Sequence, residues 1–332
     1  MSVPPTMRAL RQASLDGPRD LHLVTDAPVP RPGPGEVLVR VTAAGVNFVD
    51  VSQARGAFPG GPRPPYVAGM EGAGEIVALG EGVTGPEPGT HVVGTNIAGG
   101  AFAEYMVLAA PAVLPVPPGW TDEQALGLVV NWPTALAALT TLGGVTPGET
   151  VLVHAAAGGT GQAAVRLARH HGATVVATAS PEKHEVVRAL GADHVVDSRD
   201  PDLAAAVLRL TDGAGVDLVL ESVGGATFDA SLAVAKRVTG RVVVYGLAGG
   251  EATITNWDLV YRHQVHVIGL NIGTLVQAAP RLFGEVMGRL FELLATGVIT
   301  PGLPTAYELA DGPKAFAELE ARTTVGKLAL LP

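Results

Sequence analysis

A glycine-rich run follows directly on an apolar run near the middle of the chain. Residues 151–153 read VLV, and Ala155, Gly158 and Gly161 then stand in a relaxed form of the GxGxxG pattern. Glycine matters in such a turn because a Cβ would keep the phosphates of a dinucleotide away from the backbone N–H groups. A glycine turn that only lets the helix pack closely on the strand is the alternative. The residues predicted to hold the phosphates are Ala155, Gly158, Gly159, Thr160 and Gly161.

The segment ATASPEKHE, residues 177–185, predicts which dinucleotide binds. A sheet that selects NAD usually carries Asp or Glu at the end of its second strand, where the carboxylate accepts a hydrogen bond from the ribose 2'-hydroxyl. Thr178, Ala179 and Ser180 stand there instead. Ser180 can donate a hydrogen bond and Lys183 can bring a positive charge to a 2'-phosphate, so the sequence favours NADPH. The alternative is that Ser180 only starts the next helix and that Lys183 is solvated.

The elements that would position these residues form a repeating pattern after residue 120. Six apolar runs of strand length are separated by stretches long enough to form a helix. Strands that are apolar throughout are buried on both faces, and their alternation with helices is typical of a doubly wound parallel sheet. The expected strands are residues 151–155, 174–179, 194–198, 216–222, 241–246 and 265–270.

The first third of the chain has a different organisation. Short β-rich runs, residues 36–41, 73–79 and 91–94, are separated by Pro and Gly clusters such as RPGPG and TGPEPG. Clusters of this kind form turns and cannot continue a strand, so we expect an antiparallel, loop-rich β domain here.

The composition excludes several classes of protein. The 332 residues are 47% hydrophobic and 16% charged, which fits a globular protein of two domains. The net charge is −9 and no basic cluster is present, so nucleic acid is not an expected partner. The absence of cysteine excludes disulfides and thiolate metal ligands, and it fits a reducing cytoplasm. The first residues, MSVPPTMRAL, lack the features of a secretion signal.

One segment has the length and the lack of charge of a membrane span. It runs from Ala125 to Gly148, and Asn131, Trp132 and Pro133 interrupt its middle. We therefore expect a buried helix, broken near Pro133, and no association with a membrane.

Motifs along nearly the whole chain resemble the medium-chain dehydrogenases/reductases, and within them the zinc-free quinone oxidoreductase branch. No one motif is specific, but the set is. The segments that carry the resemblance are GVNFVDVSQARG (45–56), AGMEGAGEIVALGEGV (68–83), AFAEYMVL (101–108), AAAGGTGQAAVRLA (155–168), LGADHVVDSRD (190–200) and RTTVGKLALLP (322–332).

The resemblance implies an α/β protein in which a doubly wound parallel Rossmann sheet is joined to a β-rich GroES-like catalytic domain. The expected catalytic domain comprises residues 1–123 and 272–332, and the dinucleotide-binding domain comprises residues 124–271. Members of the family commonly form homodimers through the last strand of the sheet, here residues 265–270, which would otherwise be an exposed apolar edge.

Two residues depart from the zinc-dependent branch of the family. Asn47 stands where that branch carries a cysteine ligand, and Met70 stands where it carries the histidine of GHE. An amide and a thioether do not replace thiolate and imidazole at a catalytic zinc, so we expect no metal.

The same resemblance places further residues in the site. The Asn47 amide is the expected donor to the oxygen of the acceptor, and Asp50 lies three residues further along the same motif. Both side chains could instead only stabilise their loop. Tyr245 is a candidate proton donor, although an aromatic side chain at the end of a strand is more often packing. The remaining residues expected to contact the cofactor, besides Asn47 itself, are Thr134, Ser198, Gly246 and Lys327.

The predicted activity is transfer of hydride from NADPH to a quinone or an α,β-unsaturated carbonyl. Without zinc no strong Lewis acid polarises an alcohol, whereas an electrophilic acceptor needs only hydrogen-bond donors and correct positioning. A protein that binds NADPH with little or no turnover is one alternative, and a sheet that holds another adenine-containing ligand is a second.

Overall fold

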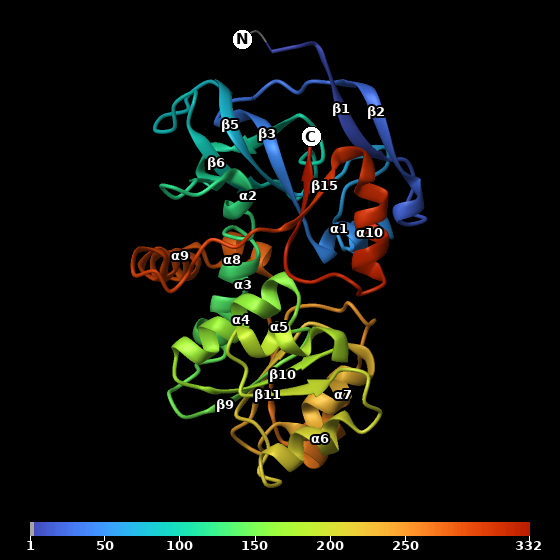
Figure 1. Ribbon diagram of the computed structural model, residues 1–332, viewed down its shortest axis with the longest axis vertical. Coiled ribbons are helices and arrows are strands. Elements are labelled where there is room, and N and C mark those ends of the chain that lie inside the picture. Colours follow the sequence, from blue (N-terminus) through green and yellow to red (C-terminus); the bar gives the residue numbers. More distant parts are fainter. Residues whose placement is uncertain (1–2) are drawn as a thin grey trace. The chain divides into compact units, whose positions relative to one another are not determined.

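The computed structural model describes residues 3–332, which divide into two compact units (Figure 1). One unit contains residues 3–130 and 301–332, and the other contains Asn131–Thr300. The division differs from the expected boundaries mainly at residues 272–300. Helix α9 (Pro280–Ala295), which was expected in the catalytic domain, packs against helix α3 (Asn131–Leu136) and therefore belongs to the second unit.

The second unit is built on a six-stranded sheet with the order β11-β10-β9-β12-β13-β14 within the described residues. Each neighbouring pair is parallel, so the doubly wound sheet predicted from the sequence is confirmed. The chain reverses its direction of winding between β9 and β12, which is the point where such sheets bind ligands. The strands are β9 (Thr150–Val153), β10 (Thr174–Ala179), β11 (His194–Asp197), β12 (Leu218–Glu221), β13 (Arg241–Val244) and β14 (His266–Gly269).

Helices cover both faces of this sheet (Figure 1). Helices α4 (Gly159–His170) and α5 (His184–Ala189) lie on one face, and α6 (Leu203–Leu210) and α7 (Gly225–Val234) lie on the other. Because both faces are covered, the central strand residues are buried, which explains why most of them are apolar. The unit also contains a 3-10 turn (Pro181–Lys183), a π-helical turn (Asp258–His263) and α8 (Ile272–Ala278).

The apolar segment that has the length of a membrane span folds differently from the expectation. Helix α3 begins at Asn131 and continues as a π-helical turn over Ala137–Leu142. Pro133 lies in the first turn of α3, where its missing N–H breaks no helical hydrogen bond, so it does not interrupt the helix. In the part of the chain that the structure describes, every helix is too short or too polar to span a bilayer.

The first unit is β-rich, as predicted. Its described residues form a three-stranded sheet, β2-β1-β4, and a seven-stranded sheet, β15-β16-β3-β5-β6-β8, in which β7 also pairs with β3. The pairs are antiparallel except β15 with β16. The strands are β1 (Thr6–Gln12), β2 (Leu21–Pro28), β3 (Glu36–Val46), β4 (Tyr66–Val67), β5 (Glu71–Leu79), β6 (His91–Thr95), β7 (Tyr105–Ala109), β8 (Val113–Pro115), β15 (Thr305–Glu308) and β16 (Leu328–Leu331).

The C-terminal segment completes the core of this unit. Phe316 of α10 (Gly312–Glu320) meets Phe102 edge to face, with ring centroids 5.7 Å apart, and both side chains are fully buried. Strand β16 pairs with β3 so that Leu328 lies opposite Val46. The end of the chain is thereby held beside the segment that contains Asn47. The other helical segments are α1 (Phe48–Ala54), α2 (Asp122–Ala125) and 3-10 turns at Pro18–Asp20, Ala110–Ala112 and Leu309–Asp311.

Candidate active site and cofactor site

A buried cluster of charged and polar side chains lies where β3, β5 and β16 meet in the first unit. The Lys327 Nζ donates to Asn47 Oδ1 over 2.7 Å and also to the Glu71 carboxylate. Asn47 Nδ2 donates to Glu71 Oε2 over 2.9 Å. The Glu71 side chain is fully buried, and that of Lys327 is 12% exposed. The three groups form one connected network in which a buried carboxylate is paired with a cation, as burial of a charge requires.

Strand pairing puts these three residues together. Gly45 lies opposite Ala329 on β16 and opposite Glu71 on β5, so it is flanked by both charged partners. A Cβ on Gly45 would stand 2.4 Å from Glu71 Oε2 and 2.8 Å from Lys327 Cε. The glycine is therefore required because the ion pair occupies the space that a side chain would take.

The hydrogen bonds of Asn47 differ from what a donor to the acceptor would need. Besides the bond to Glu71, Nδ2 donates to the Gly45 carbonyl oxygen over 3.2 Å, so both amide hydrogens have partners within the protein. The ammonium of Lys327 carries three hydrogens, and within residues 3–332 the structure gives it two partners. Lys327, which the sequence placed near the cofactor, is thus the better-suited donor in this cluster.

Asp50 lies next to this cluster, and its carboxyl group accepts hydrogen bonds from backbone N–H groups rather than from side chains. Its Oδ2 accepts from the Asn47 N–H over 2.8 Å, and its Oδ1 accepts from the Met70 N–H over 3.1 Å. Burial raises the pKa of Asp50 to about 7, although the two backbone N–H groups and the charge of Lys327 oppose the shift. The carboxyl group ties together the two segments that carry Asn47 and Met70.

These residues do not fit a catalytic zinc. The chain has no cysteine, Met70 offers only a thioether, and Asn47 Oδ1 and the Glu71 carboxylate already accept from a lysine ammonium. Among the described residues, no group of three or more His, Asp or Glu side chains is arranged to hold a metal ion.

The glycine-rich loop of the second unit has the geometry of a phosphate-binding turn. Gly158 precedes the first residue of α4, and the first turn of this helix carries no acidic side chain that would repel phosphate. A Cβ on Gly161 would stand 2.3 Å from the Ala155 carbonyl oxygen, so only glycine fits there. Ala155 has φ = 47°, a left-handed conformation that favours glycine. Thr160 Oγ1 accepts from Asn131 Nδ2 over 2.9 Å.

The segment predicted to hold the cofactor's ribose is tied to this loop and contains a carboxylate. Ala156 N–H donates to the Thr178 carbonyl oxygen over 3.0 Å, which joins the glycine loop to the end of β10. Ser180 Oγ donates to Glu182 Oε1 over 2.6 Å. The expectation that no carboxylate stands near this site holds for the end of the strand, but it overlooked Glu182. Lys183 is 8% exposed rather than solvated, and burial lowers its pKa.

Arg199, which was not predicted from the sequence, lies after the neighbouring strand β11 and beside the residues that follow β10. Ser198 N–H donates to the Ala179 carbonyl oxygen over 2.9 Å, so the residues after β11 lie beside those after β10. Arg199 Nη2 then donates to Glu182 Oε2 over 2.6 Å. The motif LGADHVVDSRD contained the signal, since an arginine directly follows a strand that ends at the ligand-binding edge of the sheet.

The other predicted residues of the second unit are Thr134, which lies in α3, and Tyr245 and Gly246, which directly follow β13. Thr134 is buried in α3, and Gly246 follows β13, where a Cβ would stand 2.6 Å from the Ser222 carbonyl oxygen. Burial raises the pKa of Tyr245 above its usual value, and a hydrogen bond with the Ser222 side chain opposes the shift. Tyr245 is therefore a weaker acid than a solvated tyrosine.

Two further buried polar groups were not predicted. His154 shares hydrogen bonds of 3.0 Å with Thr178 Oγ1 and with Ser231 Oγ, and burial lowers its pKa to about 4. Glu221 accepts from the N–H groups of Val223 and Gly224 and so fixes the turn before α7. Both groups hold the sheet's ligand-binding edge in place.

A doubly wound sheet with a glycine loop, in one chain with a β-rich domain, is the arrangement found in nucleotide-dependent dehydrogenases and reductases. Residues 33–118 match the family described as alcohol dehydrogenase GroES-like domain, and residues 159–290 match the family described as zinc-binding dehydrogenase. The chain belongs to the medium-chain dehydrogenase/reductase superfamily, and the family and fold class expected from the sequence are confirmed.

Three solved structures are similar over nearly the whole chain. A mycobacterial protein solved in complex with NADPH is 35% identical, with a TM-score of 0.91, over 98% of this chain and 100% of that one. A quinone oxidoreductase from Pseudomonas syringae is 34% identical, with a TM-score of 0.90, over 98% and 100%. The enoyl reductase CurK is 30% identical, with a TM-score of 0.85, over 98% of each chain.

A curated relative is much longer than this chain. The pikromycin polyketide synthase component PikAII of Streptomyces venezuelae is 38% identical over 312 residues, which are 92% of this chain and 8% of that protein. The similarity therefore concerns one region of a large synthase.

Proposed function

We propose that this oxidoreductase uses NADPH to reduce a quinone or an α,β-unsaturated carbonyl and needs no zinc. The observation that carries the proposal is the Lys327–Asn47–Glu71 network, in which an ammonium takes part in hydrogen bonds with a residue at a ligand position of the zinc branch. The similarity to a quinone oxidoreductase, to an enoyl reductase and to a protein complexed with NADPH supports the acceptor class and the cofactor.

The second unit supplies residues that fit NADPH. The N–H groups at the start of α4 suit the pyrophosphate, and the absence of a Cβ at Gly161 lets the first turn of this helix lie directly against the backbone of Ala155. Ser180 and Arg199 are donors suited to the 2'-phosphate. When bound, NADPH supplies the hydride for an electrophilic acceptor.

In this proposal Lys327 donates a hydrogen bond to the carbonyl oxygen of the acceptor. Negative charge builds on that oxygen as the acceptor is reduced, and a preorganised cation in a largely buried position stabilises it. Asn47 and Glu71 position the ammonium, because both accept its hydrogen bonds. Asp50 positions Asn47 by accepting from its backbone N–H.

Turnover with a panel of acceptors tests the proposal. NADPH oxidation would be followed with a small quinone, a linear enone and a simple ketone, alongside direct titration of NADPH. We expect reduction of the quinone, the enone or both, and none of the ketone. NADPH binding without oxidation by any acceptor would instead identify a binding protein.

We also propose that the chain forms a homodimer along β14. This strand is the edge of the sheet and pairs only with β13 among the described residues. Its Val267 is 36% exposed, and Trp257 and Tyr261, close in sequence, are 65% and 64% exposed. An uncovered apolar edge strand favours pairing with a second copy.

A further inference from the structure

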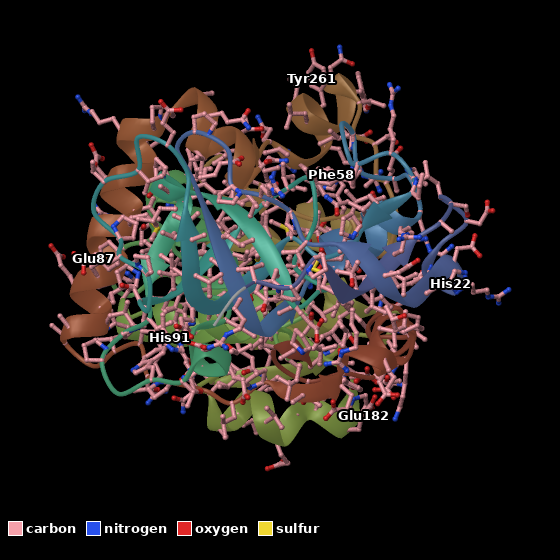
Figure 2. All side chains as sticks on the ribbon, turned by 90° about the horizontal axis from the view of Figure 1, so that it is seen from above. His22, Phe58, Glu87, His91, Glu182 and Tyr261 are labelled. Atoms are coloured by element: carbon pink, nitrogen blue, oxygen red, sulfur yellow. The ribbon has the colours of Figure 1, made fainter. Side chains whose placement is uncertain are left out.

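Three side chains after strands β10 and β11 form a small exposed network. Glu182 bridges the other two, since its Oε1 accepts from Ser180 Oγ over 2.6 Å and its Oε2 accepts from Arg199 Nη2 over 2.6 Å. The side chains of Glu182 and Arg199 are 58% and 61% exposed. Glu182 is one of the side chains labelled in Figure 2.

Strand pairing fixes this network at the ligand-binding edge. Ala179, the last residue of β10, lies opposite Asp197, the last residue of β11. Ser180 and Arg199 follow these two residues within one and two positions, so their proximity is a property of the sheet rather than of a mobile loop. The position of Arg199 is fixed further by its N–H, which donates to Asp197 Oδ1 over 2.9 Å.

Each carboxylate oxygen of Glu182 accepts one hydrogen bond, and two oxygens of a phosphate group could accept the same two hydrogen bonds. A hydroxyl and a guanidinium are the donors that bind a phosphate monoester, and the guanidinium can do so with two parallel N–H groups. Glu182 is ionised at neutral pH, because the hydrogen bond from Ser180, its own backbone and Arg199 together lower its pKa to about 2. An anion of the protein itself therefore accepts hydrogen bonds from both donors.

We propose that Glu182 is an internal competitor for the 2'-phosphate of NADPH, and that it limits the preference of this protein for NADPH over NADH. This inference rests on the proposed function, since it assumes that NADPH binds at this edge. When the 2'-phosphate binds, Ser180 and Arg199 exchange the carboxylate of Glu182 for phosphate oxygens, and the released carboxylate turns to water. NADH carries no phosphate there, so it binds without the exchange.

The energetics of the exchange favour the phosphate but reduce its advantage. An exposed ion pair is a weak interaction, so its loss is easily offset by the doubly charged phosphate. The released carboxylate still lies near the phosphate and repels it. Removing the charge of Glu182 should therefore strengthen binding of a 2'-phosphate and leave binding of the unphosphorylated ligand unchanged.

Calorimetric titration of the full chain with 2',5'-ADP and 5'-AMP tests this inference without any turnover. In the Glu182→Gln variant we expect the affinity for 2',5'-ADP to rise about three- to tenfold, with the affinity for 5'-AMP unchanged. Glu185→Gln is the matched control, since it removes the same charge three residues further along the chain. The Glu185 side chain is 89% exposed and accepts a hydrogen bond from Arg188 rather than from Ser180 or Arg199. This variant should change neither affinity.

The Arg199→Gln variant separates competition from simple repulsion. We expect it to weaken 2',5'-ADP binding about tenfold, and we expect Glu182→Gln to give a smaller gain in that background than in the wild type. Titration of NADPH and NADH with the same variants should show the same ratios.

Each outcome bears on one of the two proposals. If wild type binds NADPH but Glu182→Gln leaves 2',5'-ADP affinity unchanged or lowers it, Glu182 does not compete, and the proposed function stands. An equal gain for Glu185→Gln would reduce the effect to net charge and would also overturn the inference. If wild type binds neither NADPH nor 2',5'-ADP, the cofactor assignment fails and this inference fails with it.

Discussion

Lys327 and Asn47, 280 positions apart in the chain, are joined by a hydrogen bond of 2.7 Å from Nζ to Oδ1. The direction of this bond changes the role of the amide. Asn47 is an acceptor toward Lys327 and a donor toward Gly45 and Glu71, so it holds a cation in place. In the zinc-dependent branch, from which this chain departs, a metal ligand stands at the position of Asn47, whereas here this residue accepts a hydrogen bond from an ammonium.

Substitution of Lys327 by methionine should lower kcat about 100-fold, the smaller end of the range for loss of one preorganised donor, because quinones accept hydride readily. The affinity for NADPH should stay nearly constant, since the contacts proposed for its phosphates lie on the glycine loop and at Ser180 and Arg199. A large loss of affinity would instead assign Lys327 to the cofactor, the role expected from the sequence. Steady-state kinetics with a quinone and an enone, together with NADPH titration, measure both quantities.

Two further variants control this experiment. Lys314→Met removes an exposed lysine of α10 and should leave kcat unchanged. Lys327→Met alone leaves Glu71 buried without its partner, so the double variant with Glu71→Gln tests the role of the cation without an unpaired charge. Full kcat in a folded double variant would contradict the proposed donor.

The sequence predicted the sheet because its strands carry a strong local signal. Strands β9, β10 and β13 are largely buried, so most of their residues are apolar. The pairing of β16 with β3 left no such signal. It depends on contacts between the two ends of the chain, which is why the partners of Lys327 and the role of Glu71 were not predicted.

Arg199 and Glu182 were missed for a related reason. Both are exposed charged residues in turns, and such residues are usually only solvated. Their contact follows from the register between β10 and β11, which places Ala179 opposite Asp197. Sequence alone does not give this register to within one residue.

The oligomeric state of the protein tests the proposed dimer interface along β14. We expect the wild-type protein to be a dimer and Val267→Lys to be a monomer, because a charge on an edge strand opposes pairing with a second copy. Val186→Lys is the control, since Val186 is similarly exposed, at 38%, but lies on α5. Light scattering over a concentration series gives the mass. A monomeric wild type, or dissociation by both variants, would contradict the proposed interface.

Ala155 makes backbone strain in the glycine loop measurable. Its φ of 47° costs an alanine about 1–2 kcal/mol relative to glycine, and glycine costs about 0.5–1 kcal/mol in the unfolded chain. Ala155→Gly should therefore raise the free energy of unfolding by about 0.5–1 kcal/mol, measured by urea denaturation. Ala164→Gly, within α4, should lower it by about 1 kcal/mol or more. A loss of stability in both variants would show that the alanine is unstrained.

Asp50 should make stability fall as the pH rises from about 4 to about 7. Burial raises its pKa from 3.8 to about 7 in the folded protein, so over this range the folded state keeps a proton that the unfolded chain releases. Each unit of pKa corresponds to about 1.4 kcal/mol, and the full loss is on the order of 4 kcal/mol. Asp50→Asn cannot ionise, so its stability relative to wild type should be more favourable at pH 8 than at pH 5, as urea midpoints at the two pH values would show.

Asp26→Asn, which removes a carboxylate with an 83% exposed side chain, should show no such change. If Asp50→Asn and wild type lose stability in parallel between pH 5 and pH 8, the carboxyl group is ionised throughout and its burial is compensated by Lys327 and the two backbone N–H groups.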